Sequence, residues 1–187
     1  NGNGYRRSRG PTHVIGGLIS KVRTVVIRQG RSQGQKMLVV TLEDFAGSVE
    51  AIVYPDNLEE WQPLLKPDSI VFLIGEVETR RENPNLRVNR VVPAERARRE
   101  LARQVVVKLG SSDATLEMLP EINELFQRNR GRCAICFDIT TREGAHAFVR
   151  GDTARGVDLS DDLYAGLTKL VGTEKVNYSA TSFVEGM

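Results

Sequence analysis

Cysteine, histidine and tryptophan are scarce in this sequence, which has two, two and one of them among 187 residues. The two cysteines cannot supply the disulfide framework of a small secreted domain, and such sparse use is typical of a reducing cytosol. No apolar run approaches the roughly 18 residues that a membrane-spanning helix needs. The start, residues 1–12, is polar and arginine-rich and lacks the apolar core of a signal peptide. We therefore expect a soluble cytoplasmic protein without a membrane partner.

The few metal-ligating and nucleophilic side chains form no recognisable constellation. Cys133-x-x-Cys136 is a single pair, whereas a structural zinc site needs four ligands. The odd separation of the two cysteines would place them on opposite faces of a strand. His13 and His146 have no partner that the sequence can position. We expect buried structural cysteines, no catalytic site, no cofactor and no metal.

Charge is nearly balanced overall but uneven along the chain. Residues 1–104 hold 17 Lys+Arg and 12 Asp+Glu, a net +5, and residues 105–187 hold 9 and 12, a net −3, which together give the total of +2. A basic first half suits a polyanionic partner, although a difference of this size also arises from scattered surface charge.

Five strands are predicted in the first half from β-branched residues, period-2 alternation and turn residues. Their predicted ranges are 14–28, 36–43, 48–54, 69–79 and 86–92. The first strand contains Gly16-Gly17, and paired glycines within a strand indicate a bulge or bend. A short helical connection holding Trp61 lies between the third and fourth strands. This order is that of a five-stranded OB-fold barrel, in which a bent first strand serves both halves.

The second half has a different hydrophobic pattern, which predicts a small α+β domain. Residues 104–109, 133–140, 145–150 and 174–178 read as strands. Leu116 to Phe126 carry a helical apolar period after the possible N-caps Ser112 and Asp113, and a second helix begins near the N-cap Ser160. The predicted domains are a flexible basic arm (1–13), an OB-fold (14–93), a linker helix (94–103) and a C-terminal α+β subunit-interaction domain (104–187).

Several stretches resemble one known family. Gly16-Gly17-Leu18-Ile19, the segment from Lys36 to Asp44, Gly47-Ser48-Val49-Glu50 and Tyr54-Pro55 are similar to the OB-fold segment of bacterial DNA polymerase III alpha subunits. The second half resembles the C-terminal domain of the same subunits more loosely. The resemblance implies a non-catalytic part of a replicative polymerase. It also implies single-stranded DNA, the clamp-loader tau subunit and the rest of the polymerase chain as partners. The palm carboxylates of that family are not in these residues.

Candidate DNA-binding residues follow from the OB-fold prediction. In OB-folds the second and third strands, with the loops after strands one and four, form the nucleic-acid face. The cations in and beside those loops, together with one aromatic residue that could stack on a base, are Arg28, Arg31, Lys36, Arg80, Arg81, Arg87 and Phe45.

Two other aromatic residues and two other functions are weighed against this interpretation. Phe72 lies in a stretch that is apolar on both faces and is expected in the core, and core packing is also favoured for Tyr54. A protein-binding adaptor without DNA affinity and an OB-type RNA-binding module remain open as alternatives.

Overall fold

The computed structural model describes residues 11–79, 84–110, 113–151 and 156–180, with side chains in the long helix of the second half from Glu117 onward. The chain divides into two units, residues 1–96 and 97–187. Each unit has its own apolar core and is described by itself. None of the helices in the described ranges combines the length and the apolar character needed to cross a bilayer.

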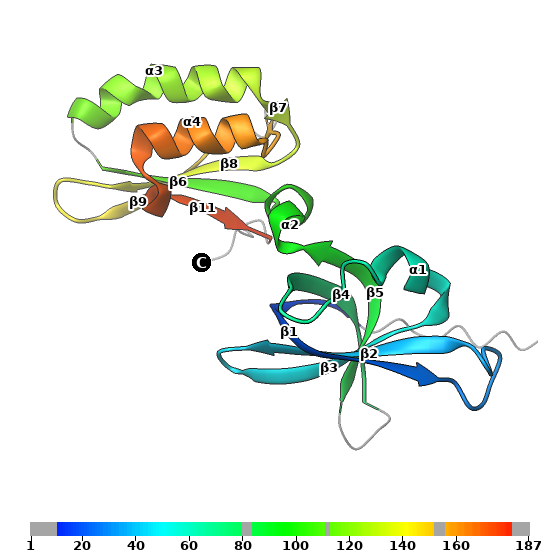
Figure 1. Ribbon diagram of the computed structural model, residues 1–187. Helices are drawn as coiled ribbons and strands as arrows, with labels where there is room; N and C mark the ends of the chain where they lie inside the picture. The colour runs from blue at the N-terminus through cyan, green and yellow to red at the C-terminus, as the bar shows by residue number, and fades with distance from the viewer. Residues whose placement is uncertain (1–10, 80–83, 111–112, 152–155, 181–187) are drawn as a thin grey trace, which may run out of the picture. The chain divides into compact units, whose positions relative to one another are not determined.

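The first unit is a closed barrel with the strand order β1-β2-β3-β5-β4 (Figure 1). Its strands are β1 (Thr12–Val26), β2 (Lys36–Asp44), β3 (Gly47–Val53), β4 (Ile70–Glu78) and β5 (Asn85–Pro93). All neighbouring strands are antiparallel except β3 and β5, which are parallel. A 3-10 turn, η1 (Pro55–Asn57), and the short helix α1 (Leu58–Trp61) connect β3 to β4. The predicted OB-fold is confirmed.

Alternating residues of every strand fill the barrel. Leu38, Val40 and Leu42 of β2 point inward and belong to one core cluster with Trp61 of α1. Trp61 is buried, as predicted for a side chain that packs its helix against the barrel. The residues between these positions therefore point outward, and they form the surfaces considered below.

β1 closes the barrel by pairing with two strands in succession. Thr12 to Leu18 pair with β4, and Leu18 to Val26 pair with β2, with a register shift between Ile19 and Lys21. The bulge therefore lies after the glycine pair. A Cβ on Gly17 would lie 2.5 Å from the carbonyl oxygen of Glu43, so this glycine permits a close approach between backbones.

The expectation that Phe72 belongs to the core is wrong. Its neighbours Val71 and Leu73 are fully buried and point inward, whereas Phe72 is half-buried and points outward. The run from Ile70 to Ile74 is apolar on both faces, so alternation of hydrophobicity could not show which residues face the core.

The second unit is a four-stranded sheet, order β11-β6-β8-β9, with two helices on one face (Figure 1). Its elements are β6 (Gln104–Gly110), α3 (Asp113–Arg128), β7 (Arg130–Gly131), β8 (Ala134–Thr140), β9 (His146–Arg150), β10 (Gly156–Val157), α4 (Asp161–Val171), η2 (Thr173–Lys175) and β11 (Val176–Ser179). α2 (Ala94–Leu101) spans the boundary between the units. β6 and β8 are parallel and joined through α3. The α+β class is confirmed, and the two-residue strands β7 and β10 were not predicted.

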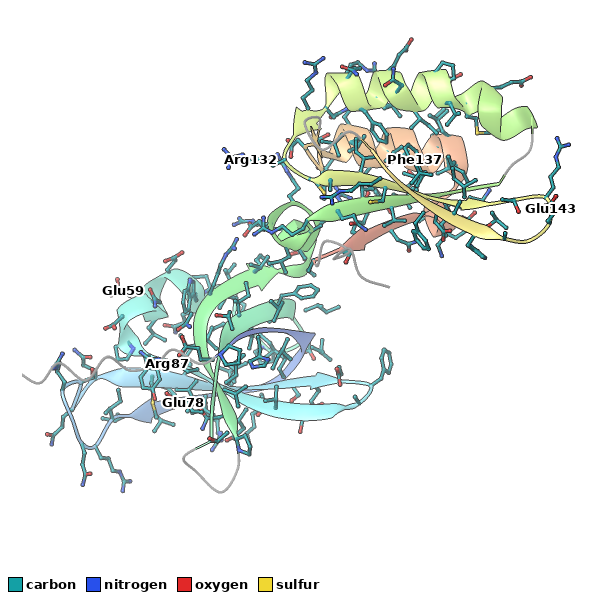
Figure 2. All side chains as sticks on the ribbon, turned by 180° about the vertical axis from the view of Figure 1, so that it is seen from behind. Glu59, Glu78, Arg87, Arg132, Phe137 and Glu143 are labelled. Carbon is teal, nitrogen blue, oxygen red and sulfur yellow. The ribbon has the colours of Figure 1, made fainter. Side chains whose placement is uncertain are left out.

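A helix cap and a pair of partly buried aromatic rings hold the helices on this sheet. The Ser160 hydroxyl oxygen accepts a hydrogen bond from the Leu163 backbone N–H at 3.0 Å, which confirms the predicted N-cap of α4. The predicted cap Ser112 lies outside the described residues. Phe137 of β8 lies between the sheet and the helices, with its ring centroid 6.2 Å from that of Phe126 of α3 (Figure 2).

The two cysteines are buried and unpaired. Cys133 belongs to the core cluster beneath the helices, whereas Cys136 lies outside that cluster. Burial raises the pKa of the Cys133 thiol from 9.0 to about 11, and it also raises the pKa of Cys136. Both cysteines are therefore neutral, protonated thiols at physiological pH. In the same unit, burial also raises the pKa of the Tyr178 phenol from 10.0 to about 12.

Gly75→Ala is predicted to destabilise the first unit. A Cβ at this bulge residue of β4 would lie 2.0 Å from the carbonyl oxygen of Arg87, so one of the two backbones must move. We expect a loss of roughly 1–3 kcal/mol in the free energy of unfolding, measured by urea denaturation with Trp61 fluorescence. Gly110→Ala of the second unit is the control, because nothing lies within 4 Å of its Cβ position, and its unfolding is followed by circular dichroism. Equal losses for the two variants would contradict the account.

Alkaline pH is predicted to destabilise the second unit. Cys133 and Tyr178 have higher pKa values in the folded than in the unfolded chain, so the unfolded chain loses these protons first. Their contribution to stability is complete below about pH 9 and is lost as pH rises toward 12. We expect the urea midpoint of the second unit, followed by circular dichroism, to fall over this range, and to fall less in Cys133→Ala. Trp61 fluorescence reports the first unit as an internal reference. An unchanged urea midpoint would contradict the raised pKa values of Cys133 and Tyr178.

Candidate nucleic-acid interface

The outward-facing residues of β2, β3 and β5 form one continuous surface, which we call the β2–β3–β5 face. Val39 of β2 lies opposite Ile52 of β3, and Ile52 lies opposite Arg87 of β5. Val39 and Ile52 are buried although they do not belong to the barrel core. The face therefore has an apolar floor that neighbouring side chains cover almost completely.

Arg87 and Tyr54 are stacked on this face. The guanidinium carbon of Arg87 lies 5.3 Å from the centroid of the Tyr54 ring, within the range of a cation–π interaction. Both side chains are half-buried, and Arg87 lies on the wall of the barrel (Figure 2). The expectation of core packing for Tyr54 is wrong, because Val53 points into the core and the next residue must point outward.

Arg23 adds a cation that sequence reasoning missed. It lies opposite Val39 in the β1–β2 register, and its guanidinium donates a hydrogen bond to the Glu50 carboxylate at 2.5 Å. Both side chains are about half exposed, so the pair contributes little to stability, about 0–1 kcal/mol. Its effect is to hold the Arg23 side chain along the face. The predicted cations lie in or close to the loops. Arg23 lies inside β1, where only the pairing register shows in which direction its side chain points.

The loop after β1 presents the predicted cations in an ordered turn. The Ile27 backbone N–H donates to the Gln35 carbonyl, and the Gly34 N–H donates to the Ile27 carbonyl, both at 2.9 Å. Gly34 has φ 84°, a conformation that favours glycine. The side chains at the three predicted positions, all exposed, are Arg28, Arg31 and Lys36. The structure thus confirms their exposure and leaves their binding role as a prediction.

Phe45 is fully exposed at the tip of the β2–β3 turn. The Asp44 carboxylate accepts hydrogen bonds from the backbone N–H groups of Ala46 and Gly47, at 2.8 and 3.0 Å, which fix the turn. Lys36 and Phe45 lie at opposite ends of β2, about 30 Å apart along the strand, and the two hairpins extend in opposite directions (Figure 1). The remaining predicted cations, Arg80 and Arg81, lie outside the described residues.

The face therefore combines guanidinium groups, a phenol ring and an apolar floor. Guanidinium groups bind phosphates, and the ring can stack against bases without reading their edges. Within the described ranges, no three His, Cys, Asp or Glu side chains are grouped as a metal site would need. The chemistry that these residues support is the binding of an extended polyanion with planar groups.

Comparison with known proteins agrees with this description. The tRNA anti-codon family, described as an OB-fold nucleic acid binding domain, matches residues 13–94. The DNA polymerase III subunit alpha of Pseudomonas aeruginosa is 33% identical over 167 residues, which is 88% of this chain and 14% of that protein. The subunits of that name from Bacillus subtilis and Escherichia coli K12 are 28% and 26% identical over 65% and 90% of this chain, or 10% and 14% of the relatives. This chain thus spans about one seventh of the first of these relatives.

Phe45→Ala is predicted to leave the stability of the chain unchanged to within about 0.5 kcal/mol, because the ring buries no surface that unfolding could expose. Trp61→Ala is the contrasting variant, and its buried ring predicts a loss of roughly 3–5 kcal/mol. Urea denaturation followed by circular dichroism measures both. A large loss for Phe45→Ala would show that this ring has a structural role.

Proposed function

We propose that this chain binds single-stranded template DNA as a non-catalytic part of a bacterial DNA polymerase III alpha subunit. The support is the match of residues 13–94 to an OB-fold nucleic acid binding domain and the similarity of the chain to these subunits. The observation that carries the proposal is the Arg87–Tyr54 stack beside the apolar floor of the β2–β3–β5 face. A guanidinium held over a ring offers a cation to a phosphate and a flat surface to a base.

The path proposed for the strand runs between the two ends of β2. The cations of the loop after β1 hold phosphates at one end, and Phe45 stacks on a base at the other. Binding sites of about 4–16 nucleotides on one OB-fold are long enough to contact both. Contacts to phosphates and ring faces carry little sequence information, so we infer binding that tolerates many sequences and depends on salt.

The second unit is proposed to contact the clamp-loader tau subunit. The support is the resemblance of residues 104–187 to the C-terminal domain of the same subunits, together with a match to the Pseudomonas aeruginosa relative that extends over 167 residues. The proposal includes a cytoplasmic location, which suits the two unpaired cysteines.

Binding to a labelled single-stranded oligonucleotide, measured by fluorescence anisotropy over a salt series, tests the proposed function. We expect Arg31→Ala and Arg87→Ala each to weaken binding and to reduce the slope of log K against log salt by about 0.7, the value for one phosphate contact on a single strand. Phe45→Ala should weaken binding by about 1–3 kcal/mol, the value for one stacked base, without changing that slope. Arg87→Lys should keep the slope, because it keeps the charge, and lose affinity, because the guanidinium plane is gone.

Lys169→Ala is the matched control, since this exposed cation lies on α4 of the second unit. It should change neither affinity nor slope. Duplex DNA and structured RNA serve as competitors. No binding at low salt would overturn the proposal and favour the adaptor function, and tighter binding of structured RNA would favour the RNA-binding module.

A further inference from the structure

Three exposed arginines lie at one end of the second unit, and we call them the arginine cluster. They are Arg103, Arg130 and Arg132. β6 and β8 run parallel from this end, and the Ala134 backbone N–H donates a hydrogen bond to the Arg103 carbonyl at 2.9 Å. The segment that carries Arg132 therefore lies beside Arg103. Arg130 belongs to β7, which pairs with β10 at the same end. Figure 2 shows Arg132 at this margin of the unit.

The nearby carboxylates do not neutralise this cluster. The acids in the second-unit part of α2 and around the start of α4 are Glu100, Asp158, Asp161 and Asp162. Arg99 of α2 donates a hydrogen bond to Asp158 at 3.3 Å, and Arg98 pairs with Asp161. Within the described ranges, no carboxylate pairs with an arginine of the cluster, and Arg130 donates to the neutral amide oxygen of Gln127 at 2.5 Å.

The arginine cluster is an excess of positive charge on a unit that is acidic as a whole. Residues 105–187 carry a net charge of −3, so the excess is local. Guanidinium groups that gather without carboxylate partners repel one another, and an anion that binds among them relieves the repulsion. The planar guanidinium group matches the geometry of a phosphate. The cluster therefore suits a ligand that carries several phosphates.

The aromatic rings at the same end are already covered. The guanidinium carbon of Arg98 lies 4.4 Å from the centroid of the Tyr164 ring and 6.0 Å from that of Tyr178. Both tyrosines are half-buried. A platform for single strands needs exposed rings on which bases stack, whereas a duplex keeps its bases stacked inside and presents its phosphates. Cations without a free ring therefore favour a duplex over a single strand.

We propose that the arginine cluster binds the phosphate backbone of duplex DNA, as a second DNA contact separate from the β2–β3–β5 face. The choice of DNA as the polyanion rests on the proposed function, whereas the site itself lies in the other unit. β5, which carries Arg87, leads directly into α2, so a short stretch of chain joins the two contacts. Linked contacts raise affinity through effective concentration. DNA in which a duplex adjoins a single strand should bind more tightly than either form alone.

Fluorescence anisotropy of the 187-residue chain with a labelled blunt-ended duplex, over a salt series, tests the proposal. We expect the double variant Arg103→Ala/Arg132→Ala to reduce the slope of log K against log salt by about 1.8, which is about 0.9 for each lost duplex phosphate contact. Its affinity for a single-stranded oligonucleotide should not change. Arg103→Lys/Arg132→Lys should keep the slope, because it keeps both charges. Circular dichroism in urea should show unchanged stability, because both side chains are exposed.

Lys169→Ala/Lys175→Ala is the matched control, because it removes the same charge from exposed positions in the last turn of α4 and in η2, away from the cluster. Its slope should stay close to that of the unchanged chain. No duplex binding at low salt, or equal effects of the two alanine variants, would overturn the proposal. Unchanged duplex binding with loss of binding to the tau subunit would also overturn it, and would make the cluster a protein contact. Duplex binding that persists without single-strand binding would refute the proposed function alone, so the two fail separately.

Discussion

Closure of the barrel depends on one strand, β1, which pairs with β4 along its first half and with β2 along its second. The strand must bend between the two pairings, and the bend requires backbones to approach where side chains cannot fit. Gly17 occupies such a position in β1, where a Cβ would lie 2.5 Å from the carbonyl oxygen of Glu43. Gly75 permits a similar approach at the bulge between β4 and β5, where a Cβ would lie 2.0 Å from the carbonyl oxygen of Arg87. Every outward surface of the barrel is set by this closure, because it decides which residues of each strand face solvent.

One consequence is that β1 contributes to two chemically different faces. Its first half places Val14 and Leu18 among apolar residues of β4, and its second half places Arg23 beside Val39 of β2. The first half of β1 therefore presents apolar side chains to solvent, and its second half contributes a cation to the β2–β3–β5 face.

The fold could be predicted largely from the sequence, because each strand of the barrel carries its own turn residues and its own apolar period. Two assignments of side-chain direction failed. Phe72 lies in a run that is apolar on both faces, so alternation could not show its direction. Tyr54 follows Val53, whose inward direction alternation indicated, so the outward direction of Tyr54 could have been predicted. Arg87 was chosen for its charge, but its stacking on Tyr54 depends on the parallel pairing of β3 and β5, which no local pattern encodes. β7 and β10 are two residues each, too short for any period.

In the proposed complex, a single strand of DNA lies on the β2–β3–β5 face. Backbone amide chemical shifts of the 187-residue chain, followed by NMR as a single-stranded oligonucleotide is added, test this placement. We predict the largest changes in β2, β3, β5 and the loop after β1, with amides of Val14 and Ile70 unchanged. Changes concentrated around Val14 and Ile70 or in the second unit would contradict this placement.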